Sequence, residues 1–311
     1  MRIVLIGQAA FGEAVFKALR ERGEEVVGVC APATPEGGRP DPLRAAAEAA
    51  GLPVLPTRRL RRDEAVVQQY LDLKPDLNVM AFVTDIIPER VLFAPPLQTI
   101  QYHPSLLPRH RGASAINWAI IQGDAITGLT IFWPDKGIDT GPILLQKDVP
   151  IGPDDTVTSL YFNHLFPLGV EAMVESVQLV RQGTAPRIEQ DHSQATYEAI
   201  CRDEHTWIDW HAAGGAVYNL VRGANPTPGA GALFRGAPIK LFDSARLTDA
   251  AGGTPGAILA VGDQGVTVAL ADGALLVKRV QVPGGPKTPA AEWARAAAVA
   301  VGERFTAGPP A

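Results

Sequence analysis

Short apolar runs alternate with helix-like segments through the first half of the chain, and this alternation constrains the fold more than any other feature. Runs typical of buried strands lie at 2–6, 26–30, 53–55, 77–82, 99–103, 129–133 and 143–150. Segments with helical periodicity lie at 12–22, 41–50, 63–73, 88–93, 113–122 and 155–181. Strands that alternate with helices indicate βαβ units. The sequence therefore predicts an α/β domain with a Rossmann-like, mostly parallel sheet.

The pattern changes near residue 190. Beyond it, short strands interrupted by glycine and proline are predicted at 239–242, 256–261, 265–269 and 275–281. That spacing is typical of a small β-barrel or sandwich. A length of 311 residues also suits two domains, since domains average about 150 residues. We therefore expect a first domain over residues 1–200 and a smaller β-barrel domain over residues 201–311.

Composition narrows the classes of function. Asp and Glu number 33 against 28 Lys and Arg, for a net charge of −5. A broad nucleic-acid surface is disfavoured, because neutralising phosphates needs clustered basic residues. The two cysteines, Cys30 and Cys201, are too few for a disulfide framework or a Cys-rich zinc site. The chain has no apolar run of about 18 residues that would cross a membrane. We expect a cytoplasmic protein with no membrane segment and no metal site.

A glycine turn follows the first predicted strand, with Gly7 and Gly12 five positions apart. A turn of this kind can hold a phosphate at a helix N-terminus, but Gln8 and Ala9 stand where a dinucleotide or P-loop motif needs glycine or lysine. The end of the second predicted strand carries Cys30 in place of a ribose-binding acid. The pattern favours a tight strand-to-helix turn and no NAD(P) site.

The segment QYHPSLLPRHRG at 101–112 contains the strongest candidate for chemistry. A predicted strand ends at His103 and is stopped by Pro104. In doubly wound sheets, ligands bind at the carboxyl ends of the strands. An unperturbed histidine exchanges its proton near neutral pH. A lone histidine is more often structural, but this position favours a catalytic one.

A second loop, DKGIDTG at 135–141, follows the strand predicted at 129–133. Asp139 lies between Gly137 and Gly141, where an aspartate often closes an Asx-turn. The alternative is a carboxylate that orients His103 or takes a proton from an attacking group. Because both loops leave the same edge of the predicted sheet, an acid–base pair is plausible.

These loops carry a family resemblance. The stretches HPSLLPRHRGASAINWAI (103–120) and GIDTGPILLQ (137–146) are similar to those of folate-dependent formyltransferases. Supporting stretches lie at 2–12, 76–88 and 154–169, and VRGANPTPGA at 221–230 resembles the family's small barrel domain. Within the family, the chain most resembles the amino-terminal hydrolase domain of 10-formyltetrahydrofolate dehydrogenase, and methionyl-tRNA formyltransferases are also similar.

The resemblance implies roles for individual residues. It makes His103 and Asp139 the catalytic pair, with His103 acting on the oxyanion and the leaving nitrogen and Asp139 orienting water. Gln101 departs from the pattern, since transferases of the family carry asparagine there and the dehydrogenase carries an apolar residue. A glutamine amide can donate the same hydrogen bond to an oxyanion on a longer stem. The folate contacts that the resemblance implies are Asp85, Ile86, Ile87, Ile138 and Asp139.

The reaction implied is removal of the formyl group of 10-formyltetrahydrofolate, which passes to water or a small amine and releases tetrahydrofolate. We expect neither a metal ion nor NAD(P) in this chain. The alternative is formylation of initiator Met-tRNA, which the loop at 31–42 disfavours because it offers one arginine and two acids for phosphate contact. A third hypothesis is a folate-binding module without activity.

Basic residues flank His110 in the same loop. Arg109 and Arg111 could draw in the anionic tail of folate, or they could belong to a solvated loop. The sequence does not separate these two interpretations.

Overall fold

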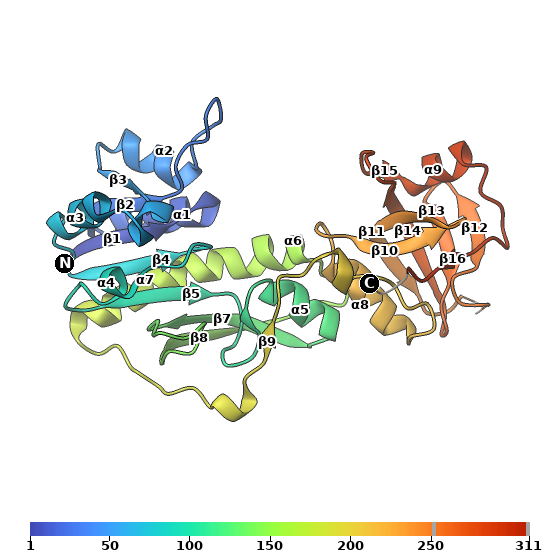
Figure 1. Cartoon of the computed structure of the whole chain (residues 1–311). Helices are drawn as coiled ribbons and strands as arrows, with labels where there is room; N and C mark the ends of the chain where they lie inside the picture. Colours follow the sequence, from blue (N-terminus) through green and yellow to red (C-terminus); the bar gives the residue numbers. More distant parts are fainter. Residues whose placement is uncertain (251–252, 309–311) are drawn as a thin grey trace. The chain divides into compact units, whose positions relative to one another are not determined.

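The structure is a computed structural model that describes residues 1–250 and 253–308. The chain divides into two compact units (Figure 1). The first contains Met1–Arg111, Gly128–Val149 and Asn163–Tyr197. The second contains Gly112–Thr127, Pro150–Phe162 and the chain from Glu198 onward. Gly112–Thr127, Pro150–Phe162 and residues 198–200 of the predicted first domain thus belong to the second unit, and the domain boundary near residue 200 stays a prediction.

The first unit is built on a mostly parallel sheet, as predicted. Its strand order is β3-β2-β1-β4-β5-β7-β8. The strands are β1 (Arg2–Gly7), β2 (Glu25–Ala31), β3 (Val54–Pro56), β4 (Leu77–Ala81), β5 (Thr99–His103), β7 (Ile126–Phe132) and β8 (Ile143–Pro150). The strands β3, β2, β1, β4 and β5 pair in parallel, whereas β7 runs antiparallel to β5. The sheet therefore has the Rossmann-like order expected from the βαβ pattern.

Helices cover both faces of this sheet because side chains alternate along each strand. On β1, Ile3 and Leu5 pack with α1 and α7, while Val4 and Ile6 pack with α3 and α4. The helical segments are α1 (Ala9–Glu21), α2 (Pro42–Ala49), η1 (Thr57–Arg61), α3 (Glu64–Asp72), α4 (Glu89–Leu92), α7 (Phe166–Gln182) and η3 (His192–Gln194). A Cβ on Gly7 would overlap the carbonyl oxygen of Ala81, so close packing of β1 on β4 explains this glycine.

The helix predicted over 155–181 is observed as an uninterrupted helical segment over 157–182 that contains a π-helical turn. The structure has α6 (Val157–Leu160), a π-helical turn η2 (Tyr161–Leu165) and then α7. Pro167, in the first turn of α7, explains the change from α-helical to π-helical hydrogen bonding. Proline has no N–H to continue the ladder and its ring crowds the carbonyl four residues earlier.

The second unit contains the predicted small barrel. Its antiparallel sheet has the order β12-β13-β14-β11-β10-β16. A bridge between Ala257 and Arg304, with hydrogen bonds such as Ile258 N to Glu303 O at 2.8 Å, joins its two edges. The strands are β10 (Ala230–Phe234), β11 (Ala237–Leu247), β12 (Ile258–Gly262), β13 (Gly265–Ala269), β14 (Ala274–Gln281), β15 (Thr288–Pro289) and β16 (Phe305–Thr306).

The remaining elements are short. The second unit also has the helical segments α5 (Ala115–Gln122), η4 (Asp203–His205), α8 (Gly214–Gly223) and α9 (Ala290–Ala296). The small ladder of β6 (Arg111–Gly112) and β9 (Tyr197–Glu198) lies where the units divide along the chain. In the described part of the chain, no helix has the length and apolarity that a membrane span requires.

Candidate active site

The predicted site residues gather at the carboxyl ends of β4 and β5 and in the loop that follows β7. A pocket of about 410 Å³ lies there, within the first unit. Its walls include all of the predicted residues except His103, namely Asp85, Ile86, Ile87, Gln101, Ile138 and Asp139. This is the edge of the sheet where doubly wound folds bind ligands. The pocket is therefore the candidate active site.

The predicted acid–base pair, His103 and Asp139, lies together at this site. The distance from His103 Nδ1 to Asp139 Oδ2 is 3.6 Å, and the two side chains are 7% and 10% exposed. His103 Nε2 lies 2.8 Å from the carbonyl oxygen of His110. Because a carbonyl oxygen only accepts, Nε2 carries the proton of this bond and Nδ1 faces the carboxylate. Nδ1 is therefore the ring nitrogen nearest Asp139, and proton exchange between the two side chains stays a prediction.

Asp139 is the member of the pair that meets the cavity, since it lines the pocket and His103 does not. Its φ of 55° places it in the left-handed region, which non-glycine residues adopt at a cost of about 1–3 kcal/mol. The Asx-turn of the loop belongs to Asp135, whose Oδ1 accepts from Gly137 N at 2.9 Å and Thr140 Oγ1 at 2.5 Å. The carboxylate of Asp139 is thus not the one that closes the turn.

Gln101 lies two residues before His103 on β5 and is half-buried. Period-two alternation places both side chains on the same face of the strand. Gln101 lines the pocket together with Asp139. The structure thus brings the three predicted catalytic side chains together, and their chemical roles stay predictions.

The predicted folate contacts differ in their environment. The carboxylate of Asp85 accepts a hydrogen bond from Thr57 Oγ1 at 2.6 Å and lies 3.4 Å from Arg58 Nε. Asp85 therefore ties the pocket wall to η1 as well as facing the cavity. Ile86 and Ile138 are 71% and 68% exposed, whereas Ile87 is buried. Two large exposed apolar side chains at one pocket mark a surface that a flat apolar ligand can cover.

The loop after His103 corrects one expectation. His110 and Arg111 are both buried, and Arg111 is only 2% exposed, so this arginine is neither solvated nor open to an anionic tail. Its guanidinium donates to Gln190 Oε1 and to the hydroxyl of Tyr197. Arg109 is exposed. The sequence analysis did not identify Gln190. Its partner Arg111 lies 79 positions earlier, and no local pattern connects the two residues.

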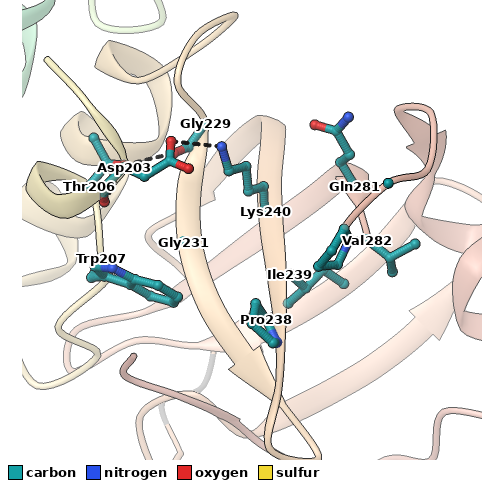
Figure 2. Close-up of a pocket in the computed structure, with 12 residues that line it drawn as sticks. Asp203, Thr206, Trp207, Gly229, Gly231, Pro238, Ile239, Lys240, Gln281 and Val282 are labelled. Carbon is teal, nitrogen blue, oxygen red and sulfur yellow. Dashed lines mark hydrogen bonds and ion pairs between the residues drawn. The ribbon is translucent and has the colours of Figure 1, made fainter. Parts of the chain in front are cut away.

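A second pocket lies in the barrel unit. Figure 2 shows Trp207 and Val282 on its walls, together with Lys240 and Asp203. Its volume is about 330 Å³. Lys240 Nζ donates to Asp203 Oδ1 at 2.8 Å and to Pro228 O at 2.9 Å, so this cation is already paired. No histidine occurs among the described residues of its walls, and the predicted acid–base pair lies at the first pocket.

Across residues 1–250 and 253–308, no group of three or more His, Cys, Asp or Glu side chains could hold a metal ion.

Comparison with known proteins gives the family. The family model described as formyl transferase matches residues 1–177. The chain belongs to the formyl transferase family. The model of this family's C-terminal domain matches residues 201–298, so both units of the chain contain matched segments. The resemblance found in the loops at 103–120 and 137–146 is thereby confirmed, and the chain is an enzyme of the formyl transferase family.

Individual relatives cover the chain to different extents. Cytosolic 10-formyltetrahydrofolate dehydrogenase of Mus musculus is 42% identical over 313 residues, which span 96% of this chain and 34% of that protein. The chain thus spans about a third of the length of that relative. Methionyl-tRNA formyltransferase of Trichlorobacter lovleyi is 36% identical, with 97% and 96% covered. The structure of HypX from Aquifex aeolicus with tetrahydrofolic acid has the same fold, with a TM-score of 0.72 at 22% identity over 97% of this chain and 48% of that one.

Proposed function

We propose that this formyl transferase family member removes the formyl group of 10-formyltetrahydrofolate, passes it to water or a small amine, and releases tetrahydrofolate. The observation that carries the proposal is the pairing of His103 with Asp139 on a pocket that also holds Gln101. The exposed side chains of Ile86 and Ile138 offer apolar surface to a pterin ring. Membership of the family supports folate as the carrier of the formyl group.

The proposed reaction begins with attack on the formyl carbon. Asp139 takes a proton from the attacking water or amine, and a new C–O or C–N bond forms. The carbonyl electrons move to oxygen, and the Gln101 amide donates a hydrogen bond to this oxyanion. The tetrahedral intermediate then collapses and the bond from carbon to N10 breaks. Asp139 passes the proton that it took to His103 Nδ1, and N10 takes the electron pair together with this proton from His103, so the products are tetrahydrofolate and formate or a formylated amine.

The orientation of His103 supports this assignment of protons. Its Nε2 proton is held by the carbonyl of His110 at 2.8 Å, which leaves Nδ1 as the nitrogen that exchanges. Nδ1 faces Asp139, so a proton that Asp139 accepts from the nucleophile is within reach of the imidazole. One pair can therefore act first as base and then as acid.

The proposal also states which kind of molecule accepts the formyl group. A small acceptor is supported by the exposed segment between β2 and α2, where Arg39 is the one basic side chain and Glu36 an exposed acid, so the segment offers little contact for tRNA phosphates. The second candidate is formylation of initiator Met-tRNA. It is favoured by the match to a methionyl-tRNA formyltransferase over nearly the full length of both proteins.

The test is release of tetrahydrofolate from 10-formyltetrahydrofolate, first without an acceptor, then with small primary amines, and then with charged initiator tRNA. Turnover without an acceptor supports hydrolysis, and turnover only with an amine supports formyl transfer to that amine. Turnover only with charged tRNA moves the assignment to the second candidate. Asp139→Asn is the test variant, and Asp148→Asn is its matched control, because Asp148 is an exposed aspartate on β8. Equal activity in the two variants contradicts the role of Asp139.

A further inference from the structure

We propose that Gln190 and Arg111 form a buried bracket that positions Asp139 and His103 by holding the backbones of their loops. This inference rests on the proposed function, because it concerns how the same pair is aligned. Gln190 and Arg111 do not line the pocket. They act through their neighbours and are positioning residues.

The Gln190 amide is oriented by its partners. Gln190 is 4% exposed. Its Nε2 donates to the backbone oxygen of Asp139 at 2.9 Å and to that of Gly141 at 2.7 Å. Its Oε1 accepts from Arg111 Nε at 3.1 Å and from Nη2 at 2.6 Å. Because carbonyl oxygens only accept and a guanidinium only donates, the amide cannot be flipped without losing these bonds.

Arg111 connects the amide to the loop that holds His103. It directly follows His110, whose carbonyl oxygen accepts the His103 Nε2 proton. The guanidinium donates to the Tyr197 hydroxyl at 2.6 Å and to His192 Nδ1 at 2.9 Å, besides its two bonds to Gln190. The N–H groups of a buried guanidinium need hydrogen-bond acceptors, because leaving them unpaired raises the free energy of the folded state. The position of Arg111 is thus closely determined.

The bracket links the loop that carries Asp139 to the loop that follows His103. On one side it holds the carbonyl of Asp139, a residue whose φ of 55° needs support from its surroundings. On the other side it fixes the residue next to the carbonyl that orients His103. The separation of Nδ1 and Oδ2 therefore depends on Gln190 and Arg111. Misplacing a reacting group by about 1 Å can cost about 100-fold in rate.

The decisive variant is Gln190→Glu. Glutamate has nearly the same shape and still accepts from Arg111, but it cannot donate to the carbonyls of Asp139 and Gly141. We expect kcat to fall by about 30- to 100-fold, while KM and the Kd for tetrahydrofolate stay within about threefold. Gln182→Glu is the matched control, because Gln182 is exposed at the end of α7. It makes the same change in charge and should leave kcat unchanged.

Two further measurements separate alignment from stability and from the proposed function. Hydrogen exchange in peptides covering 135–141 should be faster in Gln190→Glu than in the wild type, whatever reaction the enzyme performs. Tyr197→Phe removes one acceptor from Arg111 at a side chain that is largely exposed, so it tests the bracket without threatening the fold. We expect it to lower kcat by about 3- to 10-fold at unchanged KM.

The bracket is overturned if Gln190→Glu folds and keeps kcat within threefold of the wild type, or if exchange over 135–141 is unchanged. If Gln190→Glu does not fold, an unchanged kcat in Tyr197→Phe overturns it instead. A wild type without turnover on any acceptor contradicts the proposed function alone, and the exchange measurement then decides whether the bracket exists.

Discussion

Replacing Asn78 with alanine tests how the wall of the pocket is held. Asn78 is fully buried on β4. Its Nδ2 donates to the carbonyl oxygen of Val91 at 2.9 Å and to Thr99 Oγ1 at 3.2 Å. The hydroxyl of Tyr70 lies 3.0 Å from Asn78 Oδ1 and 3.1 Å from Val91 O. The network thereby anchors α4, which contributes Glu89 and Leu92 to the pocket.

The magnitude follows from these contacts. The two bonds donated by Asn78 contribute about 1 kcal/mol each, and the small cavity left by alanine adds about 1 kcal/mol more. The expected loss in free energy of unfolding is therefore about 3 kcal/mol. For a unit of about 170 residues, each kcal/mol shifts the melting temperature by about 2–4 °C. The first unit of Asn78→Ala should then melt about 6–12 °C below that of the wild type.

Differential scanning calorimetry is the suitable assay, since a chain with two compact units need not unfold in a single step. Asn163→Ala is the matched control, because Asn163 belongs to the first unit and is exposed. Its melting temperature should stay within about 1 °C of the wild type, as surface changes are usually small. A fall of less than about 3 °C in Asn78→Ala would refute the reasoning.

Three further predictions follow from the site and the core. Asp139→Asn should lower kcat by about 100- to 1,000-fold with the tetrahydrofolate Kd within threefold, measured by turnover and equilibrium binding. Gly141→Ala should lower both the melting temperature and turnover, because a Cβ there would overlap the carbonyl oxygen of Trp133; Gly262→Ala, where a Cβ meets open space, should leave both unchanged. Burial raises the pKa of the Cys30 thiol from 9.0 to about 12, so mapping by mass spectrometry at pH 8 should find this thiol modified only in unfolded protein. Because the folded thiol keeps its proton up to about pH 12 and the unfolded thiol loses it near pH 9, its contribution makes the free energy of unfolding fall as pH rises above 9.

Local sequence signals located the parts of the site that depend on strand ends. His103 could be assigned because the strand predicted at 99–103 is stopped by Pro104, and the end of a strand defines an edge of the sheet. Asp139 could be placed in a loop at that edge. Which aspartate of this loop closes the Asx-turn could be decided only from the structure. Asp135 takes that role through hydrogen bonds that the spacing of glycines does not determine.

Other features depend on contacts between distant residues and were missed for that reason. Gln190 and Arg111 are separated by 79 positions, so their bonds leave no local pattern. In the barrel, the buried residues of α8 (Gly214–Gly223) do follow helical spacing, but the helix opens on two glycines, which are poor helix formers. The short strand β10 (Ala230–Phe234) forms because antiparallel pairing with β11 and burial outweigh weak local propensity.

The most direct test of the central claim is release of tetrahydrofolate from 10-formyltetrahydrofolate by the wild type and by His103→Ala, with circular dichroism to confirm that both are folded. The measurement is made without an acceptor and repeated with small amines. The account predicts turnover by the wild type in one of these conditions and a loss of at least about 100-fold in His103→Ala, since positioned acid–base catalysis contributes about that much. A folded His103→Ala that retains wild-type turnover would contradict the account.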